Sequence, residues 1–180
     1  MLFIPGSLIA ILSFPGVIVH ETAHRLFCDL AGVPVYKVCY FQVGNPSGYV
    51  VHGPTRSLRA SFFITIGPLI VNSLLCAIIC FAPMIALSLE AADTPPAFFL
   101  LGWLGFSIGM HAFPSPQDAA TFSATVCASR GGVLHVIARA FQFLVRVANL
   151  LRMVWFDLMY AVAIASLPPL LIALATSTSQ

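Results

Sequence analysis

Charged residues are scarce in this chain: Asp, Glu, Lys and Arg make up 8% of its 180 residues, whereas 59% are hydrophobic. Soluble domains carry about 25% charged residues, so this composition excludes a soluble globular protein. The net charge of +2 is too small to suggest a nucleic-acid partner. Several apolar runs reach the ~20 residues that a helix needs to cross a bilayer. We therefore expect an all-α polytopic membrane protein.

Paired cysteines and a leader sequence are also lacking. The five cysteines form no Cys-x-x-Cys pair and are odd in number, which excludes a disulfide framework. We expect them to act as small buried side chains. The N-terminus has neither the basic region nor the small-residue cleavage site of a signal peptide. We therefore expect the first apolar run to be retained, and residues 1–180 to form a single membrane-embedded domain.

The chain does contain a His-Glu-x-x-His motif, His20-Glu21-Thr22-Ala23-His24, inside an otherwise apolar run. Residues four apart share a helix face, so His20 and His24 can bind one metal ion, and imidazoles suit tetrahedral Zn²⁺. Glu21 lies about 100° further round the helix, close enough to accept a proton from a water that zinc activates. Because ionisable side chains are costly in lipid, we interpret the motif as a functional metal site.

Four apolar segments predict the path of the chain through the membrane. We expect transmembrane helices over about residues 2–30, 60–89, 97–113 and 153–175. Pro15-Gly16 lies one turn before His20 and predicts a kink just ahead of the motif.

Two segments between these spans differ in kind. Over residues 32–59, valines and tyrosines recur among polar or small residues around the turn sequence at 45–48, which predicts a short β-hairpin. Over residues 133–152, one helical face collects the polar side chains His135, Arg139, Gln142, Arg146 and Asn149. Arginine at the centre of a span is disfavoured, so we expect an amphipathic helix in the membrane interface, with this stripe facing anionic lipid or solvent.

Lys and Arg residues mark cytoplasmic loops. They occur as Arg25, Lys37, Arg56 and Arg59 around the hairpin, and as Arg130, Arg139, Arg146 and Arg152 after the third span. The segment from Glu90 to Pro96 is acidic, and both tails lack Lys and Arg. We therefore expect both termini outside, and the motif towards the cytoplasmic side of the membrane.

A catalytic zinc usually has three protein ligands and one open position. Asp118, after the third span, lies at the same expected depth as the motif and is the main candidate for the third ligand. Asp157 and His111 are the next candidates, followed by His52, and Asp118 has the alternative role of a helix N-cap. Asn72 needs a hydrogen-bond partner in lipid, so it either joins helices or orients a substrate.

Three features follow one another along the chain. They are His-Glu-x-x-His in a first span, Gly67-Pro68 followed by Asn72 in the next, and Asp118 after Pro114 and Pro116. Over about residues 15–125 these features resemble the site-2 protease family of intramembrane zinc metalloproteases, and the hairpin looks like that family's membrane-associated strands. The chain departs from the family pattern by one extra residue between Gly67-Pro68 and Asn72, and by Ala119 in place of a glycine after the aspartate.

The resemblance implies zinc on His20, His24 and Asp118, with Glu21 as general base. The expected function is that of an intramembrane zinc endopeptidase, which cleaves membrane-protein substrates within or beside their transmembrane segments in the lipid bilayer. The alternative is a non-proteolytic zinc-binding membrane protein or a partner-binding scaffold. An intact Glu21 favours the enzyme, because a scaffold has no use for a base.

Overall fold

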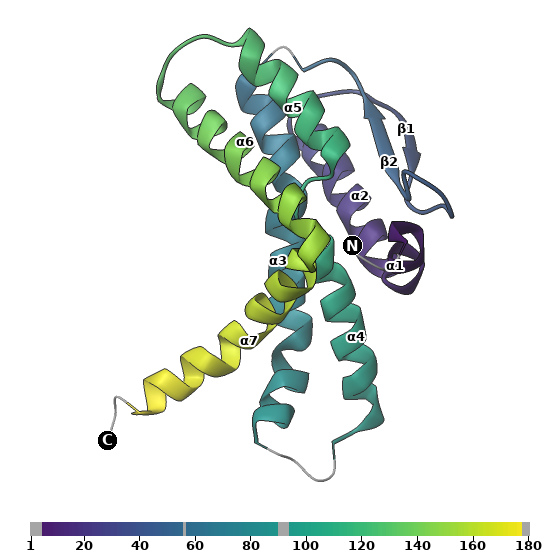
Figure 1. Ribbon diagram of the computed structural model, residues 1–180, viewed down its shortest axis with the longest axis vertical. Helices are drawn as coiled ribbons and strands as arrows, with labels where there is room; N and C mark the ends of the chain where they lie inside the picture. The colour runs from purple at the N-terminus through teal and green to yellow at the C-terminus, as the bar shows by residue number, and fades with distance from the viewer. Residues whose placement is uncertain (1–4, 56, 90–93, 178–180) are drawn as a thin grey trace.

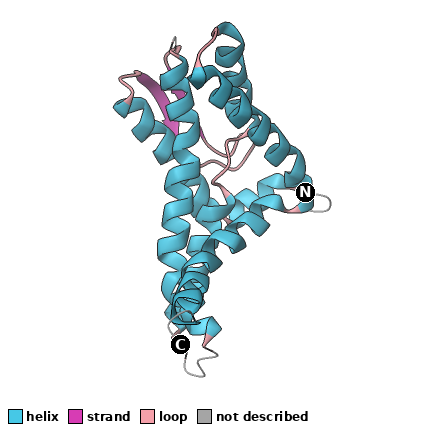
Figure 2. Ribbon diagram, turned by 90° about the vertical axis from the view of Figure 1, so that its left-hand side faces the viewer, coloured by secondary structure: helices cyan, strands magenta, loops and turns pink. Residues whose placement is uncertain are grey.

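The computed structural model describes residues 5–55, 57–89 and 94–177. Figures 1 and 2 show a mostly helical chain with one small sheet, which agrees with the predicted all-α class. The elements are α1 (Gly6–Leu12), α2 (Phe14–Leu30), β1 (Val35–Cys39), β2 (Tyr49–His52), α3 (Leu58–Ser88), α4 (Pro96–Met110), α5 (Pro116–Ala128), α6 (Val133–Leu151), a 3-10 turn η1 (Arg152–Val154) and α7 (Phe156–Ser177).

The first apolar run is broken, not straight. α1 and α2 meet at Ser13 and are bent by 89° relative to each other. Pro15 has no N–H to donate, and its ring crowds the carbonyl four residues earlier, so a regular helix cannot continue through this point. The predicted kink ahead of the motif is confirmed. Gly16 then allows close packing on α4, because a Cβ atom there would lie 1.9 Å from the Ser107 carbonyl oxygen.

The predicted hairpin is also confirmed. β1 and β2 pair antiparallel, with Val38 opposite Val50 and Cys39 opposite Tyr49. Both strands contact α2, and the connection between them carries the turn sequence at 45–48. The hairpin therefore lies against the helix that carries the His-Glu-x-x-His motif (Figure 1).

α3 is the central helix, with α2, α5 and α6 around one half and α4 and α7 around the other (Figure 1). Three small apolar clusters follow its length. They are centred on Phe27, Cys28 and Ile64; on Phe122, Val126 and Ala138; and on Cys76, Cys80 and Ala165. The cysteines of these clusters are buried and free, as expected for small core side chains, but Cys39 is only half-buried and Cys127 is exposed, so the expectation is wrong for Cys127.

Three helices are long and apolar enough to cross a membrane: α3, α6 continued through η1, and α7. α1 and α2 together would make a fourth span if the bent pair counts as one. The expected spans at 60–89 and 153–175 match α3 and α7. The expected span at 97–113 corresponds to α4, which has only 15 residues and falls short of the length that a straight span needs.

Several polar side chains of α6 make hydrogen bonds to other parts of the protein. Gln142 and Arg146 both donate hydrogen bonds to the Ser123 hydroxyl on α5, and Asn149 donates to the Pro114 carbonyl. Part of the stripe that we expected to face lipid headgroups or solvent therefore contacts α5 and the residues just before it, whereas Arg139 and Arg146 are exposed. α6 also exposes large apolar side chains, on Val133, Val136, Ile137, Phe143, Leu144, Leu150 and Leu151.

Some of the residues behind the predicted topology lie outside the described part of the chain. These are Arg56, Glu90 and Asp93, together with the start of the first expected span. Arg25, Lys37 and Arg59 are described, but no bilayer accompanies the structure. The cytoplasmic placement of the motif stays a prediction.

Candidate metal centre

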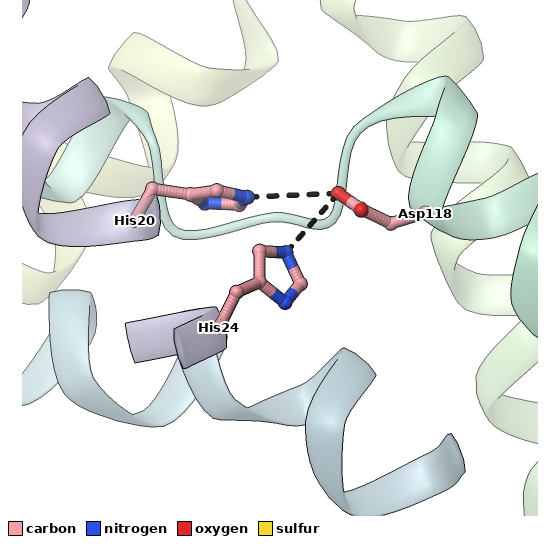
Figure 3. Close-up of side chains that lie close together, drawn as sticks. All are labelled: His20, His24 and Asp118. Carbon is pink, nitrogen blue, oxygen red and sulfur yellow. Dashed lines mark ion pairs between the residues drawn. The ribbon is translucent and has the colours of Figure 1, made fainter. Parts of the chain in front are cut away.

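α2 holds the two motif histidines on one face. His20 and His24 are one turn apart and both are buried, with ring centroids 4.8 Å apart and the rings nearly perpendicular. Helical spacing produces this pairing, because side chains four residues apart lie one above the other. Both rings point away from α2 towards the start of α5 (Figure 3).

Asp118 reaches the same point from α5. It is the third residue of that helix and forms a capping box with Ser115: the Ser115 N–H and hydroxyl donate to Asp118 Oδ2 at 2.8 and 2.7 Å, and the Asp118 N–H donates to the Ser115 hydroxyl. Ser115, not Asp118, is thus the N-cap residue. The box fixes the direction of the carboxylate and leaves it facing the histidines.

The three side chains place one ligand atom each within 4.8 Å of one another, close enough to share a metal ion. Asp118 Oδ2 lies 3.6 Å from His20 Nε2 and 3.3 Å from His24 Nε2 (Figure 3). With metal–ligand bonds of about 2.0–2.1 Å, two corners of a tetrahedral zinc site lie about 3.3 Å apart. His24 Nε2 is buried and has no hydrogen-bond partner among the described residues. A ligand atom that is left unpaired in this way fits a metal site, and no other such group of His, Cys, Asp or Glu occurs in the described chain.

Backbone carbonyls select the ring nitrogens that face Asp118. His20 Nδ1 lies 2.6 Å from the His111 carbonyl oxygen, and His24 Nδ1 lies 3.2 Å from the Ile64 carbonyl oxygen. A carbonyl only accepts, so each Nδ1 carries the proton and each Nε2 is left with a free lone pair. Such outer contacts orient metal-binding histidines and raise their basicity.

Asn72 supports this arrangement from α3. Its side chain is 0% exposed, and its Nδ2 donates to the carbonyls of Ile108 and His111 at 3.1 Å and of Gly16 at 3.4 Å. It thereby joins α2, α3 and the end of α4, and it contacts the same carbonyl that orients His20. Asn72 is absent from the lining of the cavity described next. This geometry fits the helix-joining role among the two that we considered.

A cavity of about 580 Å³ opens beside the three side chains. Glu21 lines it and is buried. The loop between β1 and β2 closes over Glu21 so tightly that a Cβ atom at Gly48 would lie 2.7 Å from Glu21 Cγ. The structure thus brings the predicted base and the predicted ligands to one cavity, with room for a ligand larger than water.

The alternative third ligands have other partners. His111 Nε2 is hydrogen-bonded to the Ser13 hydroxyl at 2.8 Å, and Asp157 is paired with Arg152. His52 lines the cavity, but its Nδ1 lies 2.8 Å from its neighbouring carbonyl. None of the three joins the group of His20, His24 and Asp118.

Charge favours an ionised Asp118. Burial alone would raise the pKa of this carboxyl, but in the metal-free protein the protonated forms of His24 and His20 beside it outweigh burial and hold the pKa well below its usual range. A carboxylate that stays ionised is ready to bind a cation.

Two neighbours of the site were missed in the sequence. The Ser-x-x-Asp spacing of Ser115 and Asp118 is that of a capping box, and it could have revealed the orienting role of Ser115. The contact between Gly48 and Glu21 has no such signal, because it depends on how the hairpin folds back over α2.

Comparison with protein-family models, curated proteins and solved structures finds no match for this chain. Its function is therefore inferred from its own residues.

Proposed function

We propose that this chain is an integral, multi-pass membrane zinc endopeptidase of the site-2 protease type. Its substrates would be transmembrane or membrane-proximal segments of other membrane proteins, cleaved towards the cytoplasmic side. The observation that carries the proposal is the convergence of His20 Nε2, His24 Nε2 and the Asp118 carboxylate beside a cavity lined by Glu21.

The residues fit the chemistry of peptide hydrolysis. Zinc, when bound, supplies a Lewis acid that activates water and polarises the scissile carbonyl. Glu21 takes a proton from the attacking water and returns it to the leaving amine as the C–N bond breaks. His20, His24 and Asp118 hold the ion, and the cavity walls keep the peptide bond beside it.

The apolar surface supports a membrane location. α3 and α7 expose large side chains such as Phe81, Leu87 and Leu170 along helices that are long enough to span. Lipid is the environment in which such surfaces are stable. A site at the end of these helices would meet substrates that are themselves in the bilayer.

The decisive experiment separates the base from the ligands. Glu21→Gln keeps size and polarity but cannot accept the proton, so we expect it to retain about one zinc per chain and to lose roughly a hundredfold or more of the cleavage rate. Asp118→Ala removes a ligand, so zinc content and cleavage should fall together. Zinc content and cleavage of a model transmembrane substrate are measured on the same purified samples.

Asp29→Asn is the matched control. Asp29 lies at the end of the same helix, with 58% of its side chain exposed and an ion pair to Arg25, so both readouts should stay at the wild-type level. Undiminished cleavage by Glu21→Gln would remove the protease mechanism. Zinc binding with no cleavage by the wild type would favour the non-proteolytic alternative.

A further inference from the structure

The cavity contains a second charged pair that the proposed hydrolysis does not use. Arg152 and Asp157 both line it, together with the metal-site residues. Arg152 is the only Lys or Arg among the described residues of that lining. The metal-site side of the cavity carries two carboxyl groups, on Glu21 and Asp118. The Arg152 guanidinium adds a positive charge to the lining of the same cavity.

The geometry of the pair leaves most of the guanidinium available. Arg152 Nε donates to Asp157 Oδ2 at 2.6 Å, and this is the one hydrogen bond that the Arg152 side chain makes to another described residue. A guanidinium has five N–H donors in a planar fork, so the two terminal nitrogens keep theirs. The Arg152 side chain is 29% exposed and that of Asp157 is 7% exposed, so the carboxylate anchors an arginine that is partly accessible.

The backbone between the two residues is shaped to bring them together. η1 follows directly on α6, and Trp155 then adopts a left-handed conformation with φ 64°. This conformation is uncommon for residues other than glycine, above all for bulky ones, and such outliers gather at functional sites. The turn reverses the chain so that Arg152, after the last residue of α6, meets Asp157 in the first turn of α7.

A structural role in joining α6 to α7 would account for the ion pair, but not for its position in the lining of the cavity. Partly buried ion pairs contribute little to stability compared with well-packed apolar residues. Asp157 Oδ1 is buried and has no hydrogen-bond partner among the described residues. Arg152 is held in place by a buried carboxylate and lines a cavity. Its guanidinium is therefore suited to bind a second carboxylate through two parallel hydrogen bonds.

We propose that Arg152, positioned by Asp157, binds a carboxylate group of the peptide substrate inside the cavity that holds the metal site. The inference rests on the proposed function only in taking the ligand to be a peptide. It makes Arg152 a specificity-determining residue. The carboxylate comes either from an acidic side chain or from a free C-terminus.

Binding of three labelled peptides tests this inference without any need for cleavage. The peptides share one short apolar sequence: one carries a Glu and an amidated C-terminus, one carries Gln and a free C-terminus, and one carries Gln and an amidated C-terminus. The protein is the full chain in detergent with Glu21→Gln, so that peptides stay intact, and fluorescence anisotropy reports affinity. We expect at least one carboxylate peptide to bind about tenfold or more tightly than the neutral one, as a charge-assisted hydrogen bond predicts.

The preference should depend on Arg152. Arg152→Gln should reduce it to less than about twofold, and Arg152→Lys should keep part of it, because the charge remains while the planar fork is lost. Arg146→Gln is the matched control, since Arg146 lies on α6 but outside this cavity, and it should keep the full preference. Which carboxylate peptide binds more tightly identifies the source of the group.

Two results would overturn the proposal. The first is equal binding of all three peptides to the Glu21→Gln protein, a result that does not depend on whether an Arg152 variant folds. The second is a full preference for the carboxylate peptides that remains in Arg152→Gln. Failure of the proposed function looks different. A protein that holds no zinc but prefers the acidic peptide through Arg152 would leave this subsite standing, whereas zinc-dependent cleavage without any charge preference would refute the subsite alone.

Discussion

Replacing Asn72 by leucine removes one buried amide and keeps about the same volume. The lost contacts are those from Nδ2 to the carbonyls of Ile108, His111 and Gly16. The His111 carbonyl is the one that accepts from His20 Nδ1. We therefore expect Asn72→Leu to weaken zinc binding, although Asn72 touches neither the metal position nor the cavity.

The size of the effect follows from the number of donors. An amide nitrogen has two N–H groups, and a net hydrogen bond contributes about 0.5–1.5 kcal/mol, so the folded state should lose roughly 1–3 kcal/mol. Loss of an outer contact to a metal ligand lowers metal affinity about 10–100-fold, which corresponds to about 1.4–2.7 kcal/mol.

Zinc affinity is measured by competition with a chromophoric chelator in detergent, next to thermal unfolding. Ser73→Ala is the control, because Ser73 on the same helix is hydrogen-bonded to Tyr160 at 2.7 Å, away from the metal site. It should lower the unfolding temperature without changing zinc affinity. If Asn72→Leu bound zinc as tightly as the wild type but raised KM for the substrate, Asn72 would orient the substrate, and the helix-joining role would be wrong.

Three further predictions follow from single contacts. Gly48→Ala should keep zinc but lower cleavage by about a hundredfold, because the new Cβ would displace Glu21; unchanged cleavage would show that the loop does not rest on Glu21. Gly16→Ala should destabilise the protein by about 3 kcal/mol or more through its clash with the Ser107 carbonyl, and a wild-type unfolding temperature would contradict the close packing of α2 on α4. In the zinc-free protein, the lowered pKa of Asp118 means that its ionised form stabilises the fold above about pH 4, the pKa range of an unfolded aspartate, and that this contribution is lost as pH falls through the folded pKa. Asp118→Asn should therefore lower the unfolding temperature at pH 7 but not at a pH well below 4, and an equal difference at both would refute the assignment.

The parts of the fold that depend on local pattern could be predicted from the sequence. The break before the motif follows from Pro15, the hairpin from alternating residues around a turn, and α3 and α7 from long apolar runs. The position of the polar stripe on α6 was visible too, since helical spacing alone defines a face. What that face contacts was not, because Ser123 became its partner only through the packing of α5 on α6.

The candidate site divides in the same way. His20, Glu21 and His24 are neighbours on one helix, so their spacing was enough to bring them together. Asp118 was selected by depth and sequence context, and the structure places it beside both imidazoles. The roles of Arg152 and Gly48 depend on a left-handed residue and on a loop that folds back, and neither feature has a periodic signal in the sequence.

α5 has more contacts with α3 and α6 than with α2. Along its length it packs on α3 and α6, while towards α2 it extends the carboxylate of Asp118 across a cavity. An ion at this point would join α2 and α5, which are far apart in the chain. Without the ion, α5 would lose this link to the motif helix. The three bonds that prepare the site for chemistry would then also hold α5 to the motif helix, so that metal binding would stabilise the fold.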